Sequence, residues 1–272
     1  MSRTHASWPR IGTEANSVIQ ADCVAPDKCP TQFPGNLNIA ASFNRTSFFL
    51  KGSVLGTEIR ALGNVRSKEC FDCPGRMTPP FSAWGPNINI IRDPRFGRTS
   101  ELASEDPFLS GHYAAGIVHG FQQRDSKGHV KALSYLKHYT MYSDQNQNQP
   151  GNVSMHDLHE SYLRQYKIAF QQGGASGAMC CYGQINGVRA CGNDYILNEV
   201  IRKQWGMRDI LIGTEYRERL ELDWCSSAIH AFWPLVRTAG GRCRPARPCL
   251  RRRKRSTRAL TLRWAARFGR RI

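Results

Sequence analysis

Residues 84–107, WGPNINIIRDPRFGRTSELASEDP, indicate the fold class because a strand pattern runs directly into a dense cluster of charges. Ile88 and Ile90 alternate with Asn87 and Asn89, and this period of two predicts a β-strand over residues 87–91. The charged residues that follow are Arg92, Asp93, Arg95, Arg98, Glu101, Glu105 and Asp106. Charges at this density are costly to bury unless they pair with each other or with a polar ligand. The segment therefore predicts either a polar binding pocket at a strand end or a solvated loop held by ion pairs.

Strand and helix patterns alternate between residues 80 and 212. Three helices are predicted, and each begins at a residue whose side chain can cap the first turn: Asp106, Ser154 and Asn193. The second helix is expected to stop at Gly173-Gly174 and the third at Trp205-Gly206. Further strands are predicted at residues 132–136, 178–181 and 210–212. Strands that alternate with helices of this length imply an α/β fold with a parallel sheet.

The two ends of the chain differ from this regular body. Residues 1–77 show no sustained periodicity and are predicted to be rich in loops. The net charge is +17, and residues 237–272 hold fourteen Lys and Arg with no Asp or Glu, which leaves 24 basic against 21 acidic residues before them. A block of like charge is typical of a disordered tail. We therefore predict a folded domain over residues 1–212 and a disordered, Arg-rich segment over residues 213–272.

Several motifs resemble those of glycoside hydrolase family 3, the β-glucosidases and β-xylosidases. The quoted stretch is similar to the family's RDPRWGR…E…EDP, with Phe96 in place of Trp. The other similar motifs follow in the family's order: Thr31–Pro34 with Ala40–Asn44, Glu58 with Arg60-Ala61, Lys137-His138-Tyr139, and Met179–Gly187. The resemblance implies that the parallel sheet belongs to a (β/α)8 TIM-type barrel, incomplete in this chain, and that residues 1–212 are a partial N-terminal domain of the family.

The resemblance also implies which residues bind the substrate: Glu14, Arg98, Lys137, His138 and Tyr182. Apart from Glu14, these residues lie at or just beyond the C-terminal end of a predicted strand, where barrel proteins assemble their sites. Each has an ordinary alternative. Arg98 would then only pair with Glu101 or Glu105, Lys137 and His138 would be a rim cation and a hydrogen-bonded barrel histidine, and Tyr182 would pack in the core.

The catalytic carboxylates are where the chain departs from the family pattern. A retaining glycosidase needs a carboxylate nucleophile and a second carboxylic acid about 5–5.5 Å away. At the family's Ser-Asp nucleophile position this chain has Gly213-Thr214-Glu215. Glu215 is the displaced nucleophile candidate, and an error of about 1 Å in its position can lower the rate about a hundredfold. No family motif follows Glu215, so the acid/base Glu is not matched and an inactive copy is expected.

Cysteine content and hydropathy limit the cofactors and the location. Ten cysteines are many for a cytosolic chain of this length, and Cys23 with Cys29, or Cys70 with Cys73, can close small loops as disulfides. A single CxxC lacks the second ligand pair of a zinc site, so no metal or other cofactor is expected. No apolar run is long enough for a membrane span, and residues 1–12 lack the apolar core of a secretory signal. Family members often work outside the cytosol, so the compartment stays open.

Three functions are compatible with these observations. The first is a β-glucosidase-like or β-xylosidase-like protein that takes a β-linked oligosaccharide or glycoside and releases its terminal glucose or xylose, in a copy without matched catalytic residues. The second is a carbohydrate binder that has lost the chemistry. The third is a nucleic-acid or anionic-membrane binder acting through Arg251–Arg255, which would attract phosphate non-specifically. No aromatic platform or nucleic-acid fold accompanies that run, so neither a nucleic-acid nor a membrane partner is expected.

Overall fold

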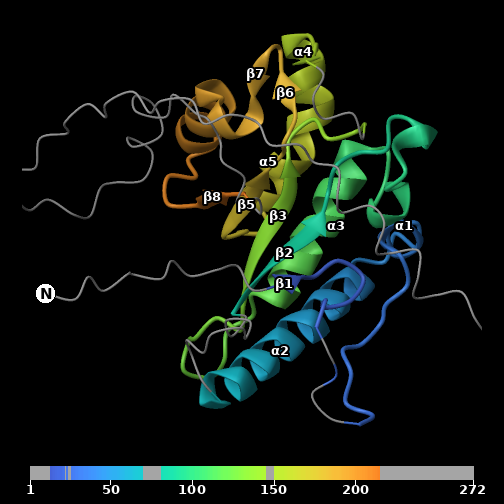
Figure 1. Cartoon of the computed structure of the whole chain (residues 1–272), viewed down its shortest axis with the longest axis vertical. Helices are drawn as coiled ribbons and strands as arrows, with labels where there is room; N and C mark the ends of the chain where they lie inside the picture. The colour runs from blue at the N-terminus through green and yellow to red at the C-terminus, as the bar shows by residue number, and fades with distance from the viewer. Residues whose placement is uncertain (1–12, 22, 24–25, 70–80, 145–149, 215–272) are drawn as a thin grey trace, which may run out of the picture. The chain divides into compact units, whose positions relative to one another are not determined.

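A computed structural model of the chain describes residues 13–21, 23, 26–69, 81–144 and 150–214. Its main sheet has five parallel strands that lie side by side in the order β1-β2-β3-β5-β8 (Figure 1). They are β1 (Thr13–Glu14), β2 (Ser82–Asn87), β3 (Leu133–Tyr139), β5 (Gly177–Cys180) and β8 (Leu211–Gly213). Each strand is added beside the previous one without a reversal, which is the order of a barrel rather than of a doubly wound sheet.

Helices connect these strands, as parallel pairing requires. They are α1 (Asn36–Ala40), α2 (Arg45–Glu69), α3 (Pro107–Phe121), the continuous run of α4 (Met155–Asp157), η3 (Leu158–Leu163) and α5 (Arg164–Gln171), and η5 (Tyr195–Gln204). Helix α2 packs against α3, and α3 packs against α5. None of the helices in the described ranges is long and apolar enough to cross a membrane.

Short elements complete the strand-to-helix connections. The single turns are η1 (Pro94–Phe96), η2 (Thr99–Glu101) and η4 (Ala190–Gly192). A second, small sheet contains β4 (Pro150–Gly151), β6 (Gln184–Ile185) and β7 (Val188–Arg189). Asn186 and Gly187 join β6 to β7 with positive φ angles of 49° and 82°, which suit a tight hairpin turn.

The main sheet is buried on both faces, which is usual for parallel sheets. Leu136 and Tyr139 of β3 belong to the largest core cluster, together with helix residues such as Tyr166. Trp84 of β2 and Tyr135 of β3 belong to a separate small cluster, and their ring centroids are 5.7 Å apart. Because both faces are covered, most positions along the central strands are buried.

The predicted helix starts are confirmed. The side chains of Asp106, Ser154 and Asn193 each accept a hydrogen bond from a backbone N–H two or three residues further on. The second helix ends before Gly173-Gly174, and the third ends before Gly206. The strands predicted at residues 132–136, 178–181 and 210–212 correspond to β3, β5 and β8, of which β3 extends three residues further to Tyr139.

The prediction that residues 1–77 are rich in loops is wrong for residues 45–69, which form the 25-residue helix α2. Helix α2 contains several glycines, and because glycine has a low helix propensity, the sequence of residues 45–69 does not predict a helix. A Cβ added to Gly52 would lie 2.0 Å from the backbone oxygen of Ile117 in α3, and one added to Gly56 would lie 2.3 Å from that of Phe121. The glycines therefore allow two helix backbones to approach closely.

The strand predicted over residues 87–91 is also misplaced, because β2 covers Ser82–Asn87 and ends where the alternation of Asn and Ile begins. Gly85-Pro86 made the first half unlike a strand, since Pro cannot donate to the ladder. Asn87 and Asn89 are only 0% and 2% exposed, as buried as Ile88 and Ile90. The asparagine and isoleucine side chains are therefore all buried, and their alternation does not indicate that one side of the segment faces solvent.

Candidate functional site

The C-terminal ends of β1 and β3 bring Glu14 and Lys137 together across the sheet. Strand β2 lies between them, with Trp84 beside Glu14 and Asn87 beside Lys137. The ammonium group of Lys137 forms an ion pair with the carboxylate of Glu14, and the two side chains are 4% and 22% exposed. Lys137 is therefore a buried cation whose charge is balanced by a residue 123 positions away in sequence.

Arg98 and Glu101 form a second ion pair on the loop after β2. Arg98 Nε and Nη2 donate to Glu101 Oε1 and Oε2 over 2.6 and 2.7 Å, a two-pronged geometry that fixes both side chains. Local folding produces it, because Gly97 has a φ of 80° and turns the chain from η1 into η2. The hydrogen bond to Glu101 raises the pKa of Arg98 above its usual value.

The charge state of Glu101 follows from its surroundings. Burial acts to raise the pKa of Glu101, but the hydrogen bonds from Arg98 and the positive charges of Arg98 and Lys137 outweigh it and lower the pKa. The amides of Asn16 and Asn87 also donate to Oε2, over 3.4 and 3.3 Å. Glu101 therefore stays ionised at neutral pH, where it pairs with Arg98 and lies within the electrostatic influence of Lys137.

His138 is held as a neutral imidazole. Burial is the first cause, and the charges of Lys137 and Arg98 add to it, so that the pKa of His138 falls to about 2. Nδ1 lies 3.1 Å from the amide oxygen of Asn89, which also accepts the backbone N–H of His138 over 2.8 Å. Because an amide oxygen only accepts, the proton is assigned to Nδ1, which leaves Nε2 as a hydrogen-bond acceptor.

Arg98 and His138 meet at Tyr142. The guanidinium carbon of Arg98 lies 5.5 Å from the centroid of the Tyr142 ring, and Arg98 Nη1 lies 3.4 Å from the Tyr142 hydroxyl. The His138 ring stands edge-on to the same ring at 4.9 Å. The structure therefore brings four of the predicted residues, Glu14, Arg98, Lys137 and His138, to one end of the sheet.

The other two predicted residues are Tyr182 and Glu215. Tyr182 is half-buried and lies two residues beyond β5, in a segment whose ends are tied by a disulfide between Cys180 and Cys191. Glu215 lies outside the described residues, as do Cys70, Cys73 and the Arg-rich segment. The predicted disulfide between Cys23 and Cys29 is present.

Sequence reasoning missed the amide side chains that support the site: Asn16, Asn36, Asn87 and Asn89. Two of them, Asn87 and Asn89, were visible only as the polar half of a strand pattern. Glu101 was foreseen as a partner of Arg98, and that ion pair is present. The described residues contain no group of three His, Cys, Asp or Glu side chains able to hold a metal ion.

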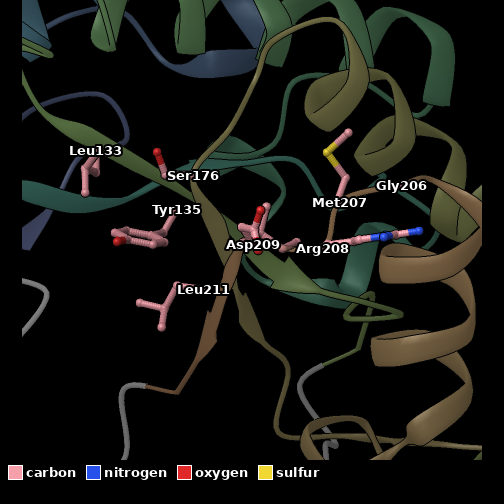
Figure 2. A pocket seen from close by; sticks show the side chains of 9 residues that line it. Leu133, Tyr135, Ser176, Gly206, Met207, Arg208, Asp209 and Leu211 are labelled. Atoms are coloured by element: carbon pink, nitrogen blue, oxygen red, sulfur yellow. The ribbon is translucent and has the colours of Figure 1, made fainter. Parts of the chain in front are cut away.

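A separate pocket lies at the other end of the sheet, near the starts of β3, β5 and β8. Its volume is about 480 Å³. Figure 2 shows Leu133, Tyr135 and Leu211 gathered on one side of it and Met207 on the other. None of the predicted site residues lines it, and the N-terminal end of the strands is not where barrels place their chemistry. The pocket is therefore distinct from the Arg98–His138 cluster.

The sequence matches known proteins over most of its described length. A sequence model of the glycosyl hydrolase family 3 N-terminal domain matches residues 24–216. Beta-xylosidase/alpha-L-arabinofuranosidase 2 of Medicago sativa subsp. varia is 37% identical over 190 residues, which are 67% of this chain and 23% of that protein. Beta-D-xylosidase 3 of Arabidopsis thaliana is 35% identical over 190 residues, with the same 67% and 23% shares. The chain thus spans about a quarter of the length of these relatives.

Solved structures show the same fold. Beta-glucosidase 3B from Thermotoga neapolitana in complex with glucose superposes with a TM-score of 0.61 at 25% identity, over 75% of this chain and 26% of that one. The exo-beta-xylosidase XlnD superposes with a TM-score of 0.66 at 23% identity, also over 75% and 26%. The five parallel strands are accordingly part of an incomplete TIM-type barrel, as the motif resemblance implied. By the extent of the sequence match, the chain belongs to glycoside hydrolase family 3.

Proposed function

We propose that this chain binds the terminal glucose or xylose of a β-linked oligosaccharide or glycoside and that it does not hydrolyse the glycosidic bond. The meeting of Arg98 and His138 on the ring of Tyr142 is the observation that carries the proposal. These residues come from separate motifs, and nothing in the local sequence requires them to share a site. A ligand rich in hydroxyl groups could form hydrogen bonds with both Arg98 and His138 at once.

The site offers complementary hydrogen-bonding groups to such a ligand. Arg98 and Lys137 can only donate, whereas the neutral imidazole of His138 presents Nε2 as an acceptor. A sugar hydroxyl both donates and accepts, so it can bridge a cation and the imidazole. Glu14 and Glu101 balance the two cations, which limits the cost of burying them. In this proposal Tyr182 approaches the sugar from the loop after β5.

Hydrolysis is not expected because the two carboxylates of a retaining mechanism are not provided. Glu14 and Glu101 are held in ion pairs with Lys137 and Arg98. Glu215 is displaced by one position from the family's nucleophile, and no residue matches the acid/base. Relatives named as β-xylosidases are glycosidases, and the chain spans about a quarter of their length. Family membership therefore supports the substrate class more strongly than it supports turnover.

Binding is tested by calorimetric titration of the purified chain with xylose and with glucose, at a pH where it is folded. The wild type is expected to bind at least one of them, and Arg98→Ala is expected to abolish the heat of binding. A wild type that binds neither sugar at millimolar concentration would overturn the proposal. Circular dichroism of Arg98→Ala checks that the loss does not come from unfolding.

Turnover is tested separately with the nitrophenyl β-glucoside and β-xyloside. The expected result is no release of nitrophenol above the uncatalysed rate. Turnover that disappears in Glu215→Gln would contradict the non-hydrolytic half of the proposal and favour the alternative that Glu215 is a working, displaced nucleophile. Binding without turnover leaves a carbohydrate binder as the function of this chain.

A further inference from the structure

Lys51 is a buried lysine that the proposed site does not use directly. It lies on α2 and is 1% exposed. Its ammonium nitrogen donates to Asn36 Oδ1 over 2.6 Å and to the Tyr113 hydroxyl over 3.1 Å. The rings of Phe33 and Tyr113 lie 5.9 and 5.8 Å away. Its partners in the described part of the chain are thus an amide, a phenol and two aromatic faces, which compensate a charge less fully than a carboxylate does.

Keeping an amine in this position has a cost. Burial lowers the pKa of Lys51 to about 7, because the charged form loses its hydration without gaining a carboxylate. An apolar residue of similar length is expected to be tolerated here, since Lys51 is 1% exposed and the aromatic rings of Phe33 and Tyr113 already lie about its side-chain end. We therefore ask which interaction of the Lys51 amine offsets the free-energy cost of burying it.

The amine sets the orientation of the Asn36 side chain. Asn36 is 0% exposed, and its Oδ1 accepts from Lys51 and from the Tyr113 hydroxyl, the latter over 2.9 Å. Its Nδ2 must then face the other way, where it donates to Asn16 Oδ1 over 2.6 Å and to the backbone oxygen of Glu101 over 2.5 Å. Rotating the amide by half a turn would put two donors together at Lys51 and two acceptors together at Asn16 and at the Glu101 backbone oxygen, and only the Tyr113 hydroxyl could adapt.

The contacts of Asn36 lead directly to the site. Glu101 is the last residue of η2, and its carboxylate holds the guanidinium of Arg98 on two prongs. Asn16, the second acceptor, also receives the backbone N–H of Asn87 over 3.1 Å. A continuous set of hydrogen bonds therefore runs from Lys51 through Asn36 to Glu101 and Arg98.

We propose that Lys51 is a positioning residue for the carbohydrate site, which locks the amide of Asn36 and thereby fixes Glu101 and the guanidinium of Arg98. The sugar-binding part of this inference rests on the proposed function, whereas the fixing of Arg98 does not depend on it. An apolar residue at position 51 would leave the fold intact and remove one of the two groups that donate to Asn36 Oδ1, so that the Tyr113 hydroxyl alone would hold that side of the amide. Arg98 would then be held less firmly, although no atom of Lys51 contacts the ligand.

The test compares Lys51→Met with Lys131→Met. Lys131 is a matched control because its ammonium group also donates to two side chains, Thr57 Oγ1 over 2.9 Å and Gln123 Oε1 over 2.8 Å, neither of which contacts Glu101. Three quantities are measured for each variant: the calorimetric Kd for xylose, the NMR signal of the Arg98 Nε–H, and the midpoint of urea unfolding.

Lys51→Met is expected to raise the Kd about tenfold, the effect of losing one hydrogen bond in a charged network. The Arg98 Nε–H signal should broaden or exchange faster with water, while the unfolding midpoint stays the same or rises. A merely structural lysine would give the opposite pattern, a lower midpoint with an unchanged Arg98 signal. Lys131→Met is expected to leave the Kd and the Arg98 signal at their wild-type values.

An unchanged Arg98 signal and Kd in folded Lys51→Met would overturn the inference. Should Lys51→Met fail to fold, Asn36→Asp decides, because it keeps an acceptor for Lys51 but removes both donations toward Asn16 and Glu101. A sharp, protected Arg98 signal in folded Asn36→Asp would equally overturn the inference. If the wild type binds no sugar, the proposed function fails, and the Arg98 signal alone still decides the role of Lys51.

Discussion

The Arg98 guanidinium serves two partners at once. Nε and Nη2 engage the carboxylate of Glu101, while Nη1 points to the hydroxyl of Tyr142. A lysine has no comparable fork, because its ammonium group is a single point of donation. The planar geometry therefore sets the direction in which Arg98 can present a donor to a ligand.

Arg98→Lys is expected to weaken xylose binding about tenfold or more while changing the free energy of unfolding by about 1 kcal/mol or less, since the pair is partly exposed. Calorimetry and urea unfolding measure the two effects. Arg95→Lys is the matched control, because Arg95 also grips one carboxylate, that of Asp93, but is 88% exposed. Equal loss of binding in both variants would contradict a specific role for the Arg98 fork.

The residues that converge at the site could be predicted, but those that support them could not. Lys137 and His138 were placed correctly because strand ends in a parallel sheet meet at one edge. The role of Asn36 could not be predicted in this way, because the sequence around it does not show whether an asparagine is buried or exposed. Its role depends on the buried amine of Lys51 and on a backbone oxygen at Glu101, and neither contact follows from spacing.

At the level of elements, helices α2 and α3 pack closely against each other. Glycines on both helices face each other: a Cβ on Gly120 of α3 would lie 2.2 Å from the backbone oxygen of Phe49 in α2, just as one on Gly52 would lie 2.0 Å from that of Ile117. Contacts this short leave no room for a methyl group. The helices can approach to this distance only where both surfaces lack side chains.

Gly52→Ala is therefore expected to destabilise the fold by about 1–3 kcal/mol or more, although alanine by itself favours a helix. Urea unfolding followed by circular dichroism gives the value. Gly192→Ala is the matched control, since no atom lies within 4 Å of its added Cβ, and its effect should stay within about 0.5 kcal/mol. Equal stability of the two variants would show that the helices can separate without cost.

Helix starts were predictable, whereas α2 was not, and the reason is physical. Capping is a local interaction, so Asp106, Ser154 and Asn193 could be identified from their own few neighbours. Helix α2 is stabilised by its packing on α3, which overrides the low helix propensity of its glycines. Similarly, the predicted range of β2 was displaced toward residues 87–91. A strand that is buried on both faces has no alternation of polar and apolar residues to mark its position.

The cap of α3 gives a second test at this scale. Asp106 accepts from the backbone N–H groups of Phe108 and Leu109 over 3.0 and 2.9 Å. Asp106→Ala is expected to lower the free energy of unfolding by about 1 kcal/mol, whereas Asp106→Asn should lower it less, because its single amide oxygen keeps one of the two acceptors. A loss of similar size in both variants, measured by urea unfolding, would contradict a contribution from the retained acceptor.

For the whole molecule, the strand order joins the site to the fold. Strand β2 lies between β1 and β3 and pairs Trp84 with Glu14 and Asn87 with Lys137, and the Glu14–Lys137 ion pair spans it. The arrangement explains how residues far apart in sequence form one cluster although the sheet has only the five described strands. The boundary at residue 212 stays a prediction, since residues 215–272 lie outside the described part of the chain.

Two buried bases near this cluster make the stability of the whole domain depend on pH. The pKa of His138 is lowered from 6.5 to about 2, so below pH 6.5 the unfolded chain takes up a proton that the folded chain refuses. Stability must then fall as the pH decreases from 6.5, by up to about 1.4 kcal/mol per pH unit. The pKa of Lys51 is lowered from 10.5 to about 7, so the unfolded chain holds the extra proton between these values and stability must rise with pH across that window.

Urea unfolding of the wild type from pH 4.5 to 9 should therefore show two rising segments, one below pH 6.5 and one between pH 7 and 9; above pH 9 the raised pKa of the buried Cys181 thiol, about 11, opposes the second rise. His138→Gln is expected to remove most of the first segment, and Lys51→Met the second, because each substitution deletes the group that differs in proton uptake between the two states. The assignment is specific, since each variant should leave the other segment in place. A Lys51→Met profile that still rises between pH 7 and 9 as steeply as the wild type would show that this amine is not the source of the second segment and would contradict its lowered pKa.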